Sequence, residues 1–355
     1  MKIKAQNKEH LQEIIKNEIR NNGIYCNLNH IDVSNVKDMS YLFPGSKFSG
    51  DISTWDVSNV VDMSGMFGRS RFNGDISNWN ICKVADMQGM FAGSKFNGDI
   101  SNWNVENVKN MNYMFANSDF NGDIHSWDTS EVKDMRAMFY KSQFNGDISN
   151  WNTSNVKDMS DMFLGSSFNG DISSWDMSNV ENMSAMFSGS QFNGDISQWD
   201  VSNVDDMSAL FQYSQFNGNI STWNTSNVVS MRHMFYQSLF DKDISNWDVS
   251  QVQDMLGMFS YSKFNGDISG WDVSSVEQMG GMFSDSLFKG DISSWNTSSV
   301  EDMDGMFAQC NAVVPYWSRI EDIEERKVAI KLYKEKKQLD SVIVQSSKNQ
   351  LIIKI

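Results

Sequence analysis

The chain has 355 residues, with 29 Lys/Arg against 45 Asp/Glu and a formal net charge of −16. The imbalance is concentrated in residues 31–310, which hold 15 Lys/Arg against 36 Asp/Glu. Such a surface repels nucleic acid and membrane phosphates and favours basic partners. The three cysteines have no paired spacing, which argues against a disulfide framework or a zinc site. No apolar run is long enough to span a membrane, and the N-terminal sequence predicts no signal peptide.

Residues 1–30 are predicted to form an N-terminal helical cap. The spacing of apolar residues predicts an amphipathic helix over 7–20, with one apolar face formed by Leu11, Ile14, Ile15 and Ile19. Asn21, Asn22 and Gly23 then end it. The terminal coil of a repeat protein needs a cover for its apolar end, and this helix is expected to supply it.

Residues 31–310 repeat with a period of 24 residues. FNGDISNWNTSNVKDMSDMFLGSS at 144–167 is followed by FNGDISSWDMSNVENMSAMFSGSQ at 168–191. All 23 phenylalanines fall in two columns, which run from Phe43 to Phe307 and from Phe48 to Phe288. A fixed period of this kind is typical of stacked coils that share one continuous core. The sequence therefore predicts a repeat solenoid of about 11–12 coils, because each coil takes one period.

Each coil is expected to contain a short strand and a short helix. The strand is predicted at Ile148, after a turn at Asn145 and Gly146. The helix is predicted over 154–163, with Asn155 as its N-cap. Its apolar residues share one face of two turns: Val156, Met159, Met162 and Phe163. Two Phe, one Trp, one Ile, one Val and two Met columns are the predicted core.

Residues 311–355 leave the repeat and are predicted to form a C-terminal helix plus β-hairpin cap. The helix is expected to start near Ser318 and to reach about Gln338. The hairpin is predicted from SVIVQSSKNQLIIKI, with its turn at 346–349. An oligomerisation or docking element is the alternative role for this segment.

The repeat F-N-G-D-I-S-x-W-D-V-S-N-V-x-D-M-S-x-M-F resembles the repeats of the BspA-like leucine-rich-repeat surface proteins, including related repeats of mycoplasma lipoproteins. The resemblance covers about residues 31–310. It implies a right-handed, leucine-rich-repeat-like α/β solenoid with short parallel strands and short helices. It also implies adhesion or protein binding at a bacterial surface. The resemblance therefore suggests a surface or secreted protein, whereas the missing signal peptide favours the cytoplasm.

Catalytic and cofactor motifs are not apparent. The four histidines share no repeat position, and we find no nucleophile–base set, P-loop or dinucleotide fingerprint. The sequence therefore predicts a protein that is not an enzyme and needs no cofactor.

The most regular polar feature is a column of acidic residues just before the Ile column. Carboxylates at sheet spacing repel one another unless a calcium ion or hydrogen-bond donors compensate them. Asp and Asn exchange along the column, which favours capping of turns by their side-chain oxygens. The alternative is a calcium ladder formed by Asp51, Asp75, Asp99, Asp123, Asp147, Asp171 and Asp195.

These features favour a non-enzymatic, adhesin-like module that binds another protein. The alternative is a cytoplasmic acidic scaffold or inhibitor that binds a basic partner, for example by mimicking nucleic acid. In either case the partner is expected to contact residues that vary between coils. One such set immediately precedes the tryptophans and includes Asn78, Asn102, Ser126, Asn150, Ser174 and Gln198.

Overall fold

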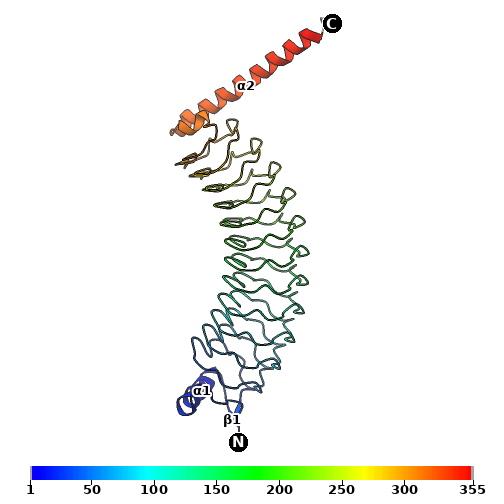
Figure 1. The fold of residues 1–355 in the computed structure, drawn as a ribbon, viewed down its shortest axis with the longest axis vertical. Helices are drawn as coiled ribbons and strands as arrows, with labels where there is room; N and C mark the ends of the chain where they lie inside the picture. The colour runs from blue at the N-terminus through cyan, green and yellow to red at the C-terminus, as the bar shows by residue number, and fades with distance from the viewer. Residues whose placement is uncertain (1, 353–355) are drawn as a thin grey trace.

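A computed structural model describes residues 2–352 as an elongated stack of coils with a helix at each end (Figure 1). The regular elements are the strands β1 (Ile3–Lys4) and β2 (Ile31–Asp32), the helices α1 (Lys8–Asn22) and α2 (Ile323–Ile352), and a 3₁₀ helix at Tyr316–Arg319. β1 pairs in parallel with β2. The tandem 24-residue coils confirm the predicted repeat solenoid.

The helix predicted over 7–20 is confirmed as α1, which covers the first coil. Its N-cap is Asn7, whose side-chain oxygen accepts a hydrogen bond from the His10 amide at 2.9 Å. Leu11 is fully buried. At the other end Gly23 adopts a φ of 83° and donates its amide to Ile19, a conformation that favours glycine.

The core consists of the predicted columns of aromatic, aliphatic and sulfur-containing side chains. Phe139 and Phe163 stack with ring centroids 5.8 Å apart, and Trp151 and Trp175 stack at 6.5 Å. Each tryptophan from Trp55 to Trp295 also donates its indole N–H to a carbonyl 27 residues earlier in the chain. Successive coils are thus joined by ring stacking and by a buried hydrogen bond.

The prediction of a helix over 154–163 was wrong, because this segment forms turns. Alternate amides donate to carbonyls of the following coil, that of Met159 to Asn182 and that of Phe163 to Met186, both at 3.0 Å. Asp161 has a φ of 58°, which a right-handed helix does not accommodate. The apolar side chains reach the core as predicted. Backbone amides of this segment, however, donate to carbonyls of a neighbouring coil and not to the carbonyl four residues earlier, as they would in an α-helix.

The strand predicted at Ile148 was also wrong, because that residue has no strand pairing. The coils are paired instead through single parallel bridges at another position, Asp134 with Asp158 and Asp158 with Asn182. Asn155 does not cap a helix. Its amide group donates to the Ser130 carbonyl of the preceding coil at 2.7 Å.

The prediction of a C-terminal hairpin was wrong as far as residue 352, since residues 323–352 form the single helix α2, and its last residues, 353–355, lie outside the described part of the chain. The predicted turn at 346–349 contains neither Gly nor Pro, so nothing in it stops a helix that is already propagating. The helix starts later than predicted, with the Asp322 side chain accepting from the Glu325 amide at 2.8 Å. Ser318 lies in the 3₁₀ helix and donates to the Pro315 carbonyl.

A buried arginine joins α2 to the last coil. The Arg326 side chain is 2% exposed, and its guanidinium donates to the carbonyls of Thr297 and Val300 at 3.1 and 2.8 Å. Burial lowers the pKa of this guanidinium. The arginine therefore fixes the start of α2 to backbone carbonyls of the last coil.

Candidate interaction face

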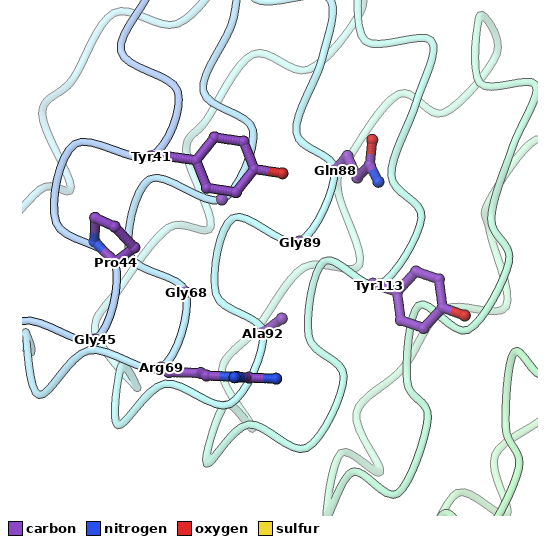
Figure 2. A pocket seen from close by; sticks show the side chains of 10 residues that line it. Tyr41, Pro44, Gly45, Gly68, Arg69, Gln88, Gly89, Ala92 and Tyr113 are labelled. Atoms are coloured by element: carbon purple, nitrogen blue, oxygen red, sulfur yellow. The ribbon is translucent and has the colours of Figure 1, made fainter.

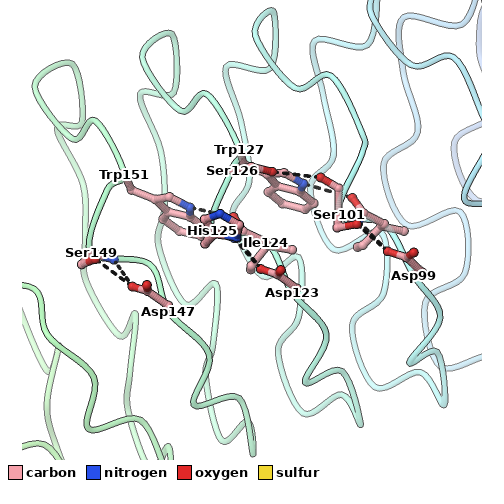
Figure 3. A network of polar contacts seen from close by, with 11 residues as sticks. Asp99, Ser101, Asp123, Ile124, His125, Ser126, Trp127, Asp147, Ser149 and Trp151 are labelled. Carbon is pink, nitrogen blue, oxygen red and sulfur yellow. Dashed lines mark hydrogen bonds and ion pairs between the residues drawn. The ribbon is translucent and has the colours of Figure 1, made fainter.

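The predicted calcium ladder is an exposed row of capped turns (Figure 3). In a typical coil, Oδ1 of Asp147 accepts from the Ser149 amide at 2.9 Å and from the Ser149 hydroxyl at 2.7 Å. Hydrogen bonds of this kind hold the pKa of Asp51, Asp75, Asp99, Asp123, Asp147, Asp171 and Asp195 below the usual range. The carboxylates are therefore ionised and already serve as turn caps.

Two further columns cap turns in the same way, one at the residue after each tryptophan and one at the bridge position. Asp176 accepts from the Ser178 amide at 3.0 Å, and Asp158 from the Ser160 amide at 2.8 Å. Across residues 2–352, side chains of His, Cys, Asp and Glu form no group of three that could hold a metal ion. Most coils thus use acidic or amide side chains at three corners to satisfy their backbone, and at the bridge position Ser230 stands in one of the remaining coils.

The partner-binding residues predicted from the sequence are all exposed and follow the edge next to the aspartate row. These residues are Asn78, Asn102, Ser126, Asn150, Ser174 and Gln198. Two of them also contribute to the joint between coils, because the hydroxyls of Ser126 and Ser174 donate to Ser101 and Ser149 carbonyls at 3.0 and 2.8 Å. The row is accessible, but part of it has a structural role.

Another surface of the coils carries residue types that its backbone conformation does not favour. Two positions in every coil have φ between about 50° and 70°, the left-handed region that favours glycine. The first, the Tyr41 column, recurs every 24 residues from Tyr41 to Gly305, and the second, the Gly45 column, from Gly45 to Gln309. Across residues 2–352, all 15 non-glycine residues with positive φ belong to these two columns.

A non-glycine residue in this conformation costs roughly 1–2 kcal/mol, yet many of these positions carry large side chains. Besides the tyrosines they include Arg69, Lys141, Asp161 and His233. Asp161 is half-buried, and burial followed by repulsion from Asp158 raises its pKa. Glycine stands at the same positions of other coils, so the large side chains are not needed for the turn. Strain that persists where a less costly residue is available points to a functional role for those side chains.

The tyrosines of the array gather on this surface. We define the tyrosine face as the Tyr41 and Gly45 columns together with the columns that start at Ser40 and Pro44. It contains all six tyrosines of residues 31–310: Tyr41, Tyr113, Tyr140, Tyr213, Tyr236 and Tyr261. It also holds four Lys/Arg against three Asp, so it is nearly neutral within a strongly acidic array.

Three of these tyrosines and a histidine form one continuous aromatic cluster. The Tyr236 ring lies 5.4 Å from Tyr213, 5.4 Å from His233 and 5.7 Å from Tyr261. Burial lowers the pKa of His233, which favours the neutral ring. A hydrogen bond with Asp285 raises the pKa of Tyr261. The cluster therefore presents uncharged aromatic surface with hydroxyl groups at its edges.

A pocket of about 510 Å³ opens on the same face near the N-terminal end (Figure 2). Tyr41 and Tyr113 stand on opposite sides of it, Gly89 lies between them, and Gly65 also lines it. Arg69 and Gln88 add polar groups to its lining. Gly89 leaves open space in the Tyr41 column, since a Cβ atom there would meet its nearest neighbour only at 3.8 Å.

This face was not predicted from the sequence, although the sequence contains a signal for it. Glycine alternates with Tyr, His, Asp and Ala along the Tyr41 column, and such exchange is typical of a left-handed position. The tyrosines also recur at only three positions of the repeat, just as the phenylalanines do at two.

Within residues 2–352, no helix is long and apolar enough to cross a membrane. A family model described as "Mycoplasma protein of unknown function, DUF285" matches four overlapping stretches of the chain, residues 11–120, 116–215, 188–286 and 212–317. The matches span the solenoid and part of α1. Neither the curated proteins nor the solved structures include a match to the chain.

Proposed function

The chain belongs to the DUF285 family of Mycoplasma repeat proteins, and from that premise we propose that it is a non-enzymatic, adhesin-like module that binds another protein through its tyrosine face. The observation that carries the proposal is the set of large side chains held at left-handed backbone positions. Tyrosine and arginine are enriched at the energetic centres of protein interfaces, and tyrosine buries a large area with little loss of conformational entropy. Both residue types occur on this face.

We further propose that the repeats are related to the BspA-like leucine-rich repeats and wind in the same right-handed sense. The shared spacing of Ile, Trp, Val, Met and Phe supports that relationship. It also supports a position at the cell surface, where an extended rod can contact a host component.

A second candidate function uses the acidic edge instead of the tyrosine face. The aspartate row is exposed and its pKa values are lowered, so it keeps its charge at neutral pH. A basic partner could dock along it, as a cytoplasmic scaffold or inhibitor would require. Binding of that kind weakens steeply as salt rises from low to physiological concentration.

Binding of the purified full chain to host cells and immobilised matrix proteins tests the proposal. One variant combines Tyr213→Ala, Tyr236→Ala and Tyr261→Ala, which removes the aromatic cluster. The matched control combines Asn102→Ala, Asn150→Ala and Gln198→Ala on the opposite candidate surface. We expect the first variant to lose at least about tenfold in affinity, since each lost hot-spot residue costs roughly 1–2 kcal/mol or more. The control should bind like the unmodified chain.

If the control loses affinity and the tyrosine variant does not, the partner uses the edge predicted from the sequence. Binding that disappears at physiological salt for both variants favours the acidic scaffold. Protease treatment of intact cells tests the location: a surface protein is cut while a cytosolic marker survives.

A further inference from the structure

The pocket near the N-terminal end of the tyrosine face takes one large side chain from each of four successive coils (Figure 2). In the order of the coils, these are Tyr41, Arg69, Gln88 and Tyr113. The side chains of Tyr41 and Tyr113 are 55 and 38% exposed, so both rings are accessible from solvent. At the usual spacing between strands, three coil steps separate the two tyrosines by about 14 Å along the stack. The volume of about 510 Å³ is within the range of sites that bind small molecules.

Three of these four residues stand at left-handed backbone positions. The φ values of Tyr41, Arg69 and Tyr113 are 52, 57 and 55°. Glycine, which adopts this conformation without strain, stands in the Tyr41 column at both coils between the two tyrosines, Gly65 and Gly89. The turn therefore does not need the large side chains. Strained residues that gather around one cavity are typical of a site where the side chains bind a ligand.

Arg69 gives this pocket its charge. Among the residues that line the pocket in the described chain, Arg69 alone is charged. Within residues 2–352, its guanidinium makes neither an ion pair nor a hydrogen bond. The array as a whole is acidic, yet the tyrosine face holds no Asp or Glu in its first four coils, from Ser40 to Asn117. An anionic group on a ligand would supply the partner that this arginine lacks.

The two edges of the tyrosine face carry opposite charges at this end of the stack. One edge is the column of the bridge position, where Asp62 and Asp86 cap turns. The other edge lies two residues beyond the Gly45 column and has basic side chains at three successive coils: Lys47, Arg71 and Lys95. Lys95 is paired with Asp119 at 2.9 Å. Arg69 belongs to the Gly45 column, so a negative group is drawn to its side of the pocket.

We propose that this pocket binds a uronic-acid oligosaccharide, a chain in which carboxylated sugar rings alternate with uncharged ones. The guanidinium of Arg69 holds a carboxylate through paired N–H groups. The rings of Tyr41 and Tyr113 pack against the apolar faces of the sugars at the two ends. Between them, the Gln88 amide bonds to a sugar hydroxyl. The step of roughly 4.8 Å per coil is close to the length of one ring in an extended sugar chain, so four coils match four rings.

Two other classes of ligand suit the pocket less well. A phosphate monoester carries nearly two negative charges at neutral pH, whereas the pocket offers one guanidinium. An acidic peptide supplies carboxylates, but its flexible side chains lack the rigid apolar faces that two tyrosines so far apart can both contact. The place of Arg69 between the tyrosines also favours a carboxylate inside the bound chain over one at its end.

Calorimetric titration of the full chain with a hyaluronan tetrasaccharide tests the proposal. The comparison ligand is its methyl ester, in which the carboxylates carry no charge. We expect the acid to bind at least about tenfold more tightly than the ester, as a charge-assisted bond to arginine requires. Arg69→Gln should lower the affinity for the acid to that for the ester and leave binding of the ester unchanged. Tyr113→Ala should weaken binding of both ligands, whereas Tyr113→Phe should retain most of it.

The matched control is Lys141→Gln. Lys141 stands in the same column as Arg69 with a φ of 49°, but it does not line the pocket. The control therefore removes one positive charge from another left-handed position of the tyrosine face, and it should bind both ligands like the unmodified chain. Thermal unfolding of each variant verifies that the fold is kept.

Equal affinities for the acid and the ester, or no binding of either, overturn the proposal. An equal loss in Arg69→Gln and Lys141→Gln overturns it too, because it would indicate general attraction to positive charge. A tetraglutamate peptide that binds more tightly than the tetrasaccharide and depends on Arg69 would assign the pocket to acidic peptides instead.

The inference does not rest on the proposed protein-binding function. The variant that replaces Tyr213, Tyr236 and Tyr261 keeps every residue of this pocket, so it should bind the tetrasaccharide normally. Failure of the one proposal is therefore distinguishable from failure of the other.

Discussion

The ring of Tyr41 occupies the space where a Cβ atom of Gly65 would lie, 2.4 Å from the Tyr41 Cε1 atom. Gly65 is the residue of the next coil in the same column. The same arrangement recurs farther along, where a Cβ atom on Gly257 would lie 2.5 Å from the His233 ring. Tyr41 and His233 therefore lean over the following coil, and glycine at the next position of the column makes room for each of them.

Gly65→Ala should reveal this dependence as a coupling between two coils. The substitution carries the left-handed penalty of roughly 1–2 kcal/mol and a further cost of the same order for moving the tyrosine ring. In a Tyr41→Ala background only the first cost should remain. Chemical denaturation of the four chains of this cycle measures the difference. Gly89→Ala is the matched control, because its added Cβ would meet its nearest neighbour at 3.8 Å. Equal losses in both backgrounds would show that the ring and the glycine are not coupled.

The strain attributed to the left-handed columns can be tested without replacing a large side chain. Ala185 has a φ of 53°, and Ala185→Gly should raise the free energy of unfolding by about 0.5–1 kcal/mol. Ala116 is not among the positive-φ residues, so Ala116→Gly should lower stability by about 1 kcal/mol. Denaturant titration compares the two. A loss of stability at both sites would remove the argument that these positions favour glycine.

The capping role of the aspartate row makes a specific prediction for Asp147. Asp147→Ala removes the acceptor of the Ser149 amide and should lower stability by about 1 kcal/mol, as loss of a helix cap does. Asp147→Asn keeps an oxygen in the same place and should cost much less. Asparagine already stands at position 219, where it accepts from the Ser221 amide. Thermal unfolding with and without calcium separates capping from metal binding. Stabilisation by calcium that Asp147→Asn abolishes would favour the ladder.

Acid should destabilise the solenoid over a defined range of pH. The pKa values of Asp75, Asp147 and Asp195 are lowered in the folded chain, first by hydrogen bonds from backbone amides. A lowered pKa contributes stability that is fully present above the unfolded value of about 3.9 and is lost as the pH falls through the folded values. The unfolding temperature should therefore fall below about pH 4. Replacing these three residues by asparagine should flatten the fall, and an unchanged profile would contradict the assignment.

Much of the architecture could be predicted because it depends on side-chain burial. The Phe and Trp columns have to face one core whatever path the backbone takes between them, so the period alone identifies the solenoid. The path itself could not be predicted from the apolar spacing. Val156, Met159 and Phe163 fit one face of a helix, but they fit the observed turns as well. The deciding residue is Asp161, whose positive φ is imposed by bonding to the next coil.

The candidate site was harder to predict than the core, for a related reason. Core columns repeat the same residue type, whereas the tyrosine face changes from coil to coil. Its members are recognised only once the two left-handed positions are known. The C-terminal hairpin failed because β propensity is a weak preference that context overrides, and α2 propagates through those residues.

Each coil is tied to its immediate neighbours by the same indole-to-carbonyl bond and by stacked phenylalanine rings. Removing or inserting one complete 24-residue unit would therefore leave every remaining joint intact. The distance between the two end caps can change in single-coil steps while the cross-section of the rod stays the same. Unequal recombination between repeats can thus alter the length of the protein, or which tyrosines are present, while every coil keeps the same fold.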